Sequence, residues 1–424
     1  MEFFFFFVRL AIISSSDIPP HIIQSKHMPI KLFVKEPRQV KPIKLYLEQN
    51  NLLNKSYKIQ KHDNIFHIYT HLDELPSDLT GHEFEQYKDE TSETITLSSM
   101  MENYCNNKHI NQLEVPKRWS IYPPMVLFNS SNNDDIFNQE HHEFWESVLS
   151  QQKHIFGTSS ITHIALNKPI IESDVMRRPH NLIPIIGDFG PDFPMDKTPT
   201  NDDFKQAFWC SVVQNGIYQT WAPKYTMFSR GNIKEKKRVM DNWKKLSGSV
   251  VFDFYCGIGY FSLSYLKNGG KLLCWELNPW SIEGFRRSLE KAGYNYKIYT
   301  RDDDSFDISD LATVDACLFI ESNENIPERI KNVKDHSLSI SHINLGLLPS
   351  SKASWGIADA LREKSNIDTT IHIHENVHID EFSKIQGEVQ EKFNQGEILY
   401  LEKVKTFAPD VWHIVIDIIN RTLN

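Results

Sequence analysis

The sequence lacks the side-chain patterns that mark disulfide scaffolds and metal sites. It has 5 cysteines in 424 residues, and none of them forms a C-x-x-C pair. Several stand in apolar runs, which is typical of buried, reduced thiols in a reducing compartment such as the cytoplasm. The 18 histidines form no metal-binding motif such as H-E-x-x-H. We therefore expect a cytoplasmic protein with no metal ion and five structural thiols: Cys105, Cys210, Cys256, Cys274 and Cys317.

The apolar run at the amino terminus is too short to cross a membrane. Five phenylalanines follow the acidic Glu2, and Arg9 interrupts the run soon afterwards. The basic flank and small-residue cleavage site of a signal peptide are also missing. We expect residues 1–27 to be an extension of doubtful structure, with Met28 as the start of the ordered chain and no membrane as partner.

An excess of basic charge is missing too, because 55 acidic residues outnumber 46 lysines and arginines and leave a net charge of −9. A nucleic-acid partner needs only a local basic patch, however. Two patches occur, over residues 31–44 and 224–245, and a solvated helix face is an alternative explanation of the first. The second immediately precedes the glycine motif described below. Its cations are Lys224, Arg230, Lys234, Lys236, Lys237, Arg238, Lys244 and Lys245.

Composition divides the rest of the chain into three regions. Residues 28–112 form an N-terminal α+β region with a strand expected over 30–34 and a polar insert, loop or disordered, over 75–112. Residues 113–247 form a middle α+β region that ends in a basic helix. In residues 248–424, short apolar strands alternate with helices, which predicts a doubly wound α/β domain with a parallel sheet covered on both faces.

The first strand of that last region carries the main motif. It ends at Asp253 and turns into a helix through Gly257 and Gly259, which let the backbone pass close to a nucleoside cofactor. A dinucleotide site would add a third glycine for the pyrophosphate, but Phe261-Ser262 stands there. The motif therefore favours S-adenosyl-L-methionine (AdoMet) and a Rossmann-like AdoMet-binding domain, with Asp253 near its amino-acid end. The alternative is a tight turn with a capping aspartate.

Polar residues end three further predicted strands. Glu276 ends the second strand, where a carboxylate accepts hydrogen bonds from ribose hydroxyls, although a solvated glutamate fits the same pattern. After the third strand, one carboxylate of Asp302-Asp303-Asp304 is expected to receive the adenine amino group, or all three form a solvated turn. Asn344 follows the fifth strand, where it orients a nucleobase or simply forms a turn.

Four segments in combination resemble the eukaryotic tRNA wybutosine-synthesizing protein 2 family. They are WAPKYTMFSRGNIKEK at 221–236, WELNP at 275–279, NLGLLPSS at 344–351 and FAPD at 407–410, and the similarity covers residues 113–424 with gaps. The resemblance implies transfer of the 3-amino-3-carboxypropyl group of AdoMet to a carbon of 4-demethylwyosine, at position 37 of tRNA-Phe. Methylthioadenosine is the by-product. The anticodon region of tRNA-Phe is the implied partner, and no obligate protein partner is evident.

The resemblance also implies roles for individual residues. Ser229, Lys236 and Glu276 would bind AdoMet, and Phe228 with Arg230 would shape its methionine end or the base pocket. No residue is identified as the base that removes the ring proton, and Glu235 and His342 stay open as candidates. The expected cofactor-binding residues are Ser229, Lys236, Asp253, Gly257, Gly259, Glu276, Asp303 and Asp304, and the expected substrate-binding residues are Phe228, Arg230 and Asn344.

Other functions remain open. A tRNA guanosine-37 N1-methyltransferase is the nearest alternative, but that relative tends to carry Asn-Leu-Pro where this chain has Asn344-Leu345-Gly346. A non-catalytic tRNA-binding protein with a transferase fold is the alternative of a different class. A nicotinamide dehydrogenase is a remote third, because the third glycine is missing.

Overall fold

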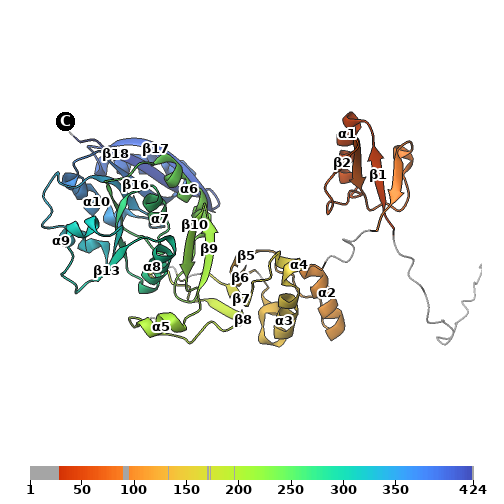
Figure 1. Cartoon of the computed structure of the whole chain (residues 1–424), viewed down its shortest axis with the longest axis horizontal. Helices are drawn as coiled ribbons and strands as arrows, with labels where there is room; N and C mark the ends of the chain where they lie inside the picture. The colour runs from red at the N-terminus through yellow and green to blue at the C-terminus, as the bar shows by residue number, and fades with distance from the viewer. Residues whose placement is uncertain are drawn as a thin grey trace, which may run out of the picture. The chain divides into compact units, whose positions relative to one another are not determined.

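The computed structural model describes residues 28–88, 95–131, 133–169, 171, 173–194 and 196–422. The chain divides into two compact units between Ile95 and Thr96, and each is described by itself (Figure 1). The predicted amino-terminal extension lies outside the described residues. Within the described ranges, every helix is too short or too polar to traverse a lipid bilayer.

The first unit is a small antiparallel sheet covered by one helix. Strand β1 (Ile30–Val34) lies where the sequence predicted it, and its alternate residues are buried. Helix α1 (Pro37–Gln49) has proline at its start and buries Ile43 and Leu47 against the sheet. The strand order is β2-β3-β1-β4, where the remaining strands are β2 (Gln60–His62), β3 (Ile65–Tyr69) and β4 (Glu83–Gln86).

Helix α2 (Leu97–Lys108) opens the second unit, within the segment predicted as a polar loop. That prediction is wrong for these residues. Thr96 begins the helix with a reciprocal capping box, and an apolar residue at every fourth position is buried although the overall composition is polar. The buried stripe packs into the core of the middle region and consists of Leu97, Met101 and Cys105.

The middle region is a four-stranded sheet, and its described helices pack on one face. Its order is β5-β6-β7-β8, in which β6 and β7 are parallel and the other neighbours antiparallel. Alternate residues, such as Phe128 and Leu166, enter a core with the helices. The elements are β5 (Trp119–Tyr122), β6 (Met125–Asn129), α3 (His142–Ser150), α4 (Gln152–Phe156), β7 (His163–Asn167) and β8 (Leu182–Ile186).

The carboxyl-terminal part contains the predicted doubly wound domain. Its eight-stranded sheet has the order β13-β14-β12-β11-β15-β16-β18-β17 and is parallel as far as β16, while β18 and β17 are antiparallel to their neighbours. The strands are β11 (Val250–Asp253), β12 (Lys271–Glu276), β13 (Tyr296–Thr300), β14 (Ala316–Ile320), β15 (Ile340–Leu345), β16 (Thr369–His378), β17 (Glu397–Ala408) and β18 (Val411–Asn420).

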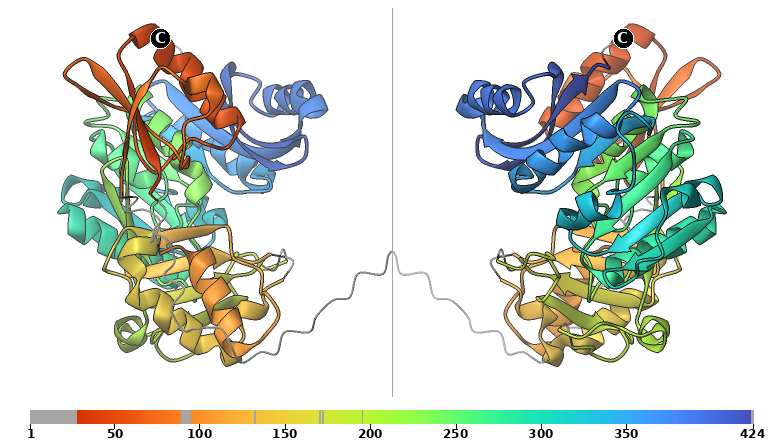
Figure 2. Two further views of the ribbon diagram at one scale, coloured as in Figure 1. Left: turned by 90° about the vertical axis from the view of Figure 1, so that its right-hand side faces the viewer. Right: turned by 90° about the vertical axis from the view of Figure 1, so that its left-hand side faces the viewer.

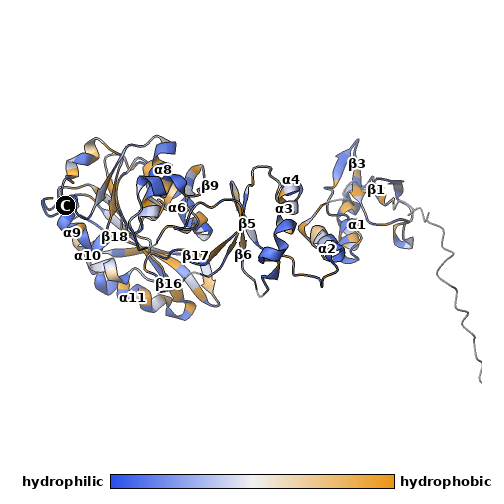
Figure 3. Cartoon of the chain, turned by 90° about the horizontal axis from the view of Figure 1, so that it is seen from below, coloured by the Kyte–Doolittle hydropathy of each residue, from blue (hydrophilic) through white to orange (hydrophobic). Residues whose placement is uncertain are grey.

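Helices cover both faces of this sheet, as Figure 2 shows from two sides. One core contains residues of three helices, α6 (Ile233–Asn242), α7 (Ser262–Lys267) and α8 (Pro279–Ala292). The other contains residues of α9 (Ile326–Arg329), α10 (Trp355–Leu361) and α11 (Phe382–Lys392). The mixed blue and orange along these helices in Figure 3 reflects their one-sided burial.

The position of β14 in the sheet decides which residues meet at its carboxyl edge. The sequence predicted this strand but not its place between β12 and β13. Glu276 at the end of β12 lies opposite Ile320 of β14, and Ile320 lies opposite Thr300 of β13. The residues that follow β14 are therefore the neighbours of Glu276, whereas Asp303 and Asp304 follow the edge strand.

Candidate functional site

Asp253 ties three elements together at the centre of the sheet. Its carboxylate is fully buried and accepts hydrogen bonds from Ser262 Oγ at 2.5 Å and from Asn344 Nδ2 at 3.0 Å. Burial raises the pKa of Asp253, and these hydrogen bonds oppose the rise. The Oδ1 atom of Asn344 is buried without a hydrogen-bond partner. Asn344 is thus held in a fixed orientation, and its free Oδ1 atom can accept a hydrogen bond from a ligand.

The turn after Asp253 has room only for glycine. Gly257 and Gly259 have φ values of 54° and 81°. A Cβ atom on Gly259 would lie 2.6 Å from the ring of Phe285, and one on Gly257 would lie 2.5 Å from the ring of Tyr260. Both glycines are therefore needed for the backbone path itself, as the motif predicted.

Among the described residues, only backbone groups donate hydrogen bonds to the carboxylate of Glu276. Its Oε2 accepts a hydrogen bond from the Gly257 nitrogen at 3.1 Å, and its Oε1 accepts one from the Asn278 nitrogen at 2.8 Å. Burial raises the pKa of Glu276 to about 7. A cavity of about 260 Å³ adjoins it, lined in part by Leu277 and Ile320 at the ends of β12 and β14. Charged residues, namely Arg178, Asp196 and Lys197, also line this cavity. A carboxylate near a cavity of mixed polarity suits the ribose of a nucleoside.

Lys236 is a buried cation with no carboxylate partner among the described residues. Its side chain is 3% exposed and donates hydrogen bonds to Gln214 Oε1 at 2.9 Å and Gln219 Oε1 at 3.0 Å. The ammonium also lies over the rings of Phe228, 4.6 Å from the centroid, and Tyr260, 5.6 Å away. Burial lowers the pKa of Lys236 to about 7. Binding of an anion next to Lys236 would stabilise its buried ammonium form.

The glycine turn connects this cation to the carboxylate of Glu276. Gln219, which accepts from Lys236, donates through Nε2 to the Gly259 carbonyl at 3.2 Å. Two residues earlier, Gly257 donates to Glu276. The turn therefore lies between an unpaired ammonium and an unpaired carboxylate. This arrangement fits AdoMet, whose α-carboxylate would meet Lys236 and whose ribose hydroxyls would meet Glu276.

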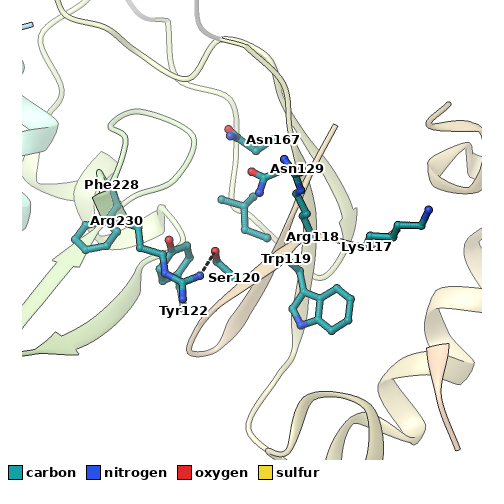
Figure 4. A pocket seen from close by; sticks show the side chains of 10 residues that line it. Lys117, Arg118, Trp119, Ser120, Tyr122, Asn129, Asn167, Phe228 and Arg230 are labelled. Carbon is teal, nitrogen blue, oxygen red and sulfur yellow. Dashed lines mark hydrogen bonds between the residues drawn. The ribbon is translucent and has the colours of Figure 1, made fainter. Parts of the chain in front are cut away.

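The loop before α6 brings the other predicted residues near this turn. Ser229 is half-buried at the start of the short helix Arg230–Asn232. Phe228 stacks on Trp221 with ring centroids 4.4 Å apart. Arg230 reaches the middle sheet, where it donates to Ser120 Oγ at 3.1 Å. Phe228 and Arg230 line a cavity of about 540 Å³ on that sheet (Figure 4).

Asp303 and Asp304 are not brought next to Glu276, because β14 separates β13 from β12. The segment that adjoins Glu276 is instead the one after β14. There, Asn323 is buried and donates through Nδ2 to the Phe254 carbonyl at 3.1 Å. Sequence reasoning missed this segment, although Glu321-Ser322-Asn323 follows an apolar run in the same way that Glu276 does.

Much of the predicted basic patch is neutralised within the protein. Arg238 binds Glu235 at 2.7 Å and Asp417 at 2.5 Å, while Lys236 is buried. Lys224 and Lys237 also form ion pairs, with Asp192 and Asp241. The cations of the patch that remain exposed and form no ion pair with a described residue are Arg230, Lys234, Lys244 and Lys245.

The two candidates for a catalytic base lie in the same buried network. Glu235 is 1% exposed and pairs with Arg238. His342 contacts His372 through a 3.0 Å hydrogen bond, and His372 binds Asp417 at 2.6 Å. Burial lowers the pKa of His342 well below its usual range. Neither side chain is exposed to a substrate, so the geometry gives them a structural role.

A Rossmann-like sheet whose glycine turn separates a buried ammonium from a strand-end glutamate defines an AdoMet-dependent transferase. The family model for the TRM5/TYW2 methyltransferase domain matches residues 211–342, which include this turn. The chain belongs to the tRNA wybutosine-synthesizing protein 2 family. It is 40% identical to that protein of Schizosaccharomyces pombe over 318 residues, which are 72% of this chain and 73% of the relative.

Further comparisons agree in family and in fold. The Saccharomyces cerevisiae tRNA wybutosine-synthesizing protein 2 is 34% identical over 429 residues, with 88% of this chain and 87% of the relative covered. The structure of P. horikoshii TYW2 in complex with MeSAdo matches with a TM-score of 0.52 at 17% identity, over 77% of this chain and all of that one. Pyrococcus abyssi Trm5b matches with a TM-score of 0.51 at 17% identity, over 93% of this chain and all of the other.

Proposed function

We propose that the protein transfers the 3-amino-3-carboxypropyl group of AdoMet to a ring carbon of 4-demethylwyosine at position 37 of tRNA-Phe. Membership of the wybutosine-synthesizing family supports this reaction. The structural observation that carries it is the unpaired ammonium of Lys236 across the glycine turn from the carboxylate of Glu276. We place the reaction in the cytoplasm and at the anticodon region of the tRNA.

Bound AdoMet supplies an electrophilic carbon attached to a sulfonium. The new bond joins the acceptor carbon to the γ-carbon, the γ-carbon–sulfur bond breaks with its electron pair moving to sulfur, and the acceptor carbon loses its proton. The neutral leaving group, methylthioadenosine, needs little electrostatic help. The task of the protein is therefore orientation, which selects the γ-carbon over the methyl group.

Lys236 and Glu276 would fix the two ends of AdoMet through charge-assisted hydrogen bonds. Gly257 and Gly259 give the ligand access to the backbone between them, and Asp253 holds Asn344 with its free acceptor beside the turn. We assign Ser229, Phe228 and Arg230 to the methionine end and the acceptor base. The turnover chemistry then depends on position more than on a dedicated base.

We place the adenine beside Ser322 and Asn323 in preference to Asp303 and Asp304. The strand order supports this assignment, because β14 is the neighbour of β12. Ser322 is half-buried, and Asn323 is buried next to the end of β11. Ser322→Val should weaken binding of methylthioadenosine, whereas Asp304→Ala should leave it unchanged; the reverse result would restore the aspartates as the adenine contact.

The by-product of the reaction tests the proposed function. Purified protein, AdoMet and tRNA-Phe carrying the tricyclic precursor should yield methylthioadenosine and a matching mass gain on the base. S-adenosylhomocysteine would make the protein a methyltransferase, the activity that the N1-methyltransferase alternative requires. Tight tRNA binding with neither product and no AdoMet binding by calorimetry would make it a tRNA-binding protein without catalysis.

A further inference from the structure

The middle sheet has one face covered by helices and a second face that is only partly covered. Residues of β5, β6 and β7 that lie opposite one another share a face, because side chains alternate along each strand. Trp119 pairs with Phe128, and both belong to the core under the helices. Leu127 and Asn129 therefore point to the second face, and so does Asn167, which pairs with Asn129.

Aromatic residues cover one end of this second face. Tyr122 and Leu127 pack in a cluster with Trp221 and Phe228, which belong to the segment leading to the AdoMet site. The rings of Tyr122 and Phe228 are 5.5 Å apart at an interplanar angle of 74°. The other end stays open and forms the cavity of about 540 Å³.

The open end is cationic. Lys117, Arg118 and Arg230 line the cavity, and no acidic residue is among the ten that line it. None of the three forms an ion pair with a described residue, unlike Lys224, Lys237 and Arg238 of the basic patch. In a chain with a net charge of −9, a cavity that gathers three unpaired cations marks a site for an anion.

Two amides complete the cavity. Asn129 and Asn167 lie directly opposite each other at the ends of parallel strands, and the backbone nitrogen of Asn129 donates to the Arg118 carbonyl at 3.1 Å. The side-chain amides make no hydrogen bond with any described residue. Adjacent amides offer the paired donors and acceptors that read the edge of a nucleobase. Figure 4 shows them near Arg118, with Arg230 and Ser120 nearer Phe228.

Phe228 is a wall common to this cavity and the AdoMet site. It lines the cavity, and its ring lies 4.6 Å below the ammonium of Lys236. A ligand in the cavity therefore lies one aromatic ring away from the cofactor end of the site. The cavity volume also falls within the range of about 300–1,000 Å³ that is usual for small ligands, which suits a single nucleotide.

We propose that this cavity binds an unpaired RNA nucleotide that flanks the nucleotide being modified. Arg118 and Lys117 contact its phosphate, and Asn129 with Asn167 contacts the edge of its base. The assignment rests on the proposed function for the identity of the RNA. It extends that function, because it places sequence recognition on the middle sheet, outside the AdoMet-binding domain.

The test compares tRNA binding by the full chain and three variants. Arg118→Ala should weaken binding of a tRNA-Phe transcript about tenfold at 0.1 M salt. The slope of the logarithm of the binding constant against the logarithm of the salt concentration should also become shallower by about 0.9. Asn129→Ala combined with Asn167→Ala should weaken binding without changing the slope. Lys291→Ala removes an exposed charge of α8 and is the matched control, with affinity expected to change less than twofold. All variants should bind AdoMet as the wild type does.

Two further transcripts identify the nucleotide. Removal of the base next to position 37, on either side in turn, should weaken binding to the wild type at one of the two positions and have no further effect on the double asparagine variant. Equal losses for both proteins at both positions would overturn the proposal, as would an Arg118→Ala variant indistinguishable from Lys291→Ala. The by-product assay tests the proposed function separately. If S-adenosylhomocysteine is formed while the binding losses described here are still observed, the proposed transfer is refuted but the nucleotide site is supported.

Discussion

The affinity for AdoMet should pass through a maximum near pH 7. Two groups of the site have pKa values of about 7 without ligand, Lys236 because burial lowers its pKa and Glu276 because burial raises its pKa. An α-carboxylate against Lys236 favours the ammonium and raises that pKa on binding. Ribose hydroxyls that donate to Glu276 favour the carboxylate and lower that pKa.

The sign of each effect follows from the form that the ligand requires. Above pH 7, the free protein must take up a proton at Lys236 before binding, which costs about 1.4 kcal/mol per pH unit, or about tenfold in affinity. Below pH 7, it must release a proton from Glu276, and the cost per unit is the same. Near the maximum the fall is smaller than this limiting slope, because both pKa values lie there. The fraction of free protein with both required forms drops from about 0.25 at pH 7 to about 0.08 at pH 6 or pH 8, so affinity at each should be about threefold below the maximum.

Titration calorimetry in buffers of different ionisation enthalpy measures both effects. Lys236→Met should weaken binding by about 1.5–3 kcal/mol at pH 6 and remove the alkaline fall. Glu276→Gln should remove the acidic fall. Methylthioadenosine is a matched ligand without the carboxylate, so its affinity should fall only on the acidic side. The amino group of AdoMet titrates near pH 8, and the comparison with Lys236→Met isolates the lysine from it.

An affinity for AdoMet that is flat from pH 6 to 8 would refute this reasoning, because it would mean that neither group changes protonation on binding. An alkaline fall that persists unchanged in Lys236→Met would place the carboxylate elsewhere. An alkaline fall for methylthioadenosine would have the same meaning, since that ligand has no carboxylate.

Three further predictions concern the framework of the site. Gly259→Ala puts a Cβ atom 2.6 Å from the Phe285 ring and should cost about 1–3 kcal/mol in stability and most AdoMet binding, measured by urea unfolding and calorimetry; normal binding would contradict the turn geometry. Asp417→Asn leaves Arg238 incompletely paired in a buried network and should cost about 3–5 kcal/mol in urea unfolding, with a loss below 1 kcal/mol as the contrary result. Met101→Ala empties a fully buried position of α2 and should cost about 2–5 kcal/mol, whereas the exposed Glu102→Ala should be neutral; equal effects would argue against the helix.

The sequence predicted local features well where one segment contains its own signal. Helix α8 begins and ends at the predicted residues because Asn278 caps it, Pro279 starts it and Gly293 ends it in the left-handed conformation. The glycine turn was predictable for the same reason. Helix α2 was missed because its composition is polar, and the core that its apolar stripe joins is built from α3 and the middle sheet, distant in sequence.

Features that depend on pairing between distant segments were out of reach. The order of strands is set by packing across the sheet, so nothing in the sequence of β14 showed that it would separate Asp303 from Glu276. The basic patch misled for a related reason, since Asp417, which neutralises Arg238, lies 179 residues away. The open cavity on the middle sheet also required three strands and a distant loop to come together.

The position of Phe228 has a thermodynamic consequence. Its ring touches both the ammonium that awaits AdoMet and the cavity that we assign to RNA, so a shift of this ring on binding one ligand changes the surface met by the other. Linkage then makes the effect reciprocal: the factor by which RNA changes AdoMet affinity equals the factor by which AdoMet changes RNA affinity. On turnover, the aminocarboxypropyl group leaves AdoMet, and its carboxylate no longer contacts Lys236. This change would alter that factor, and would thereby couple release of the modified RNA to completion of the transfer.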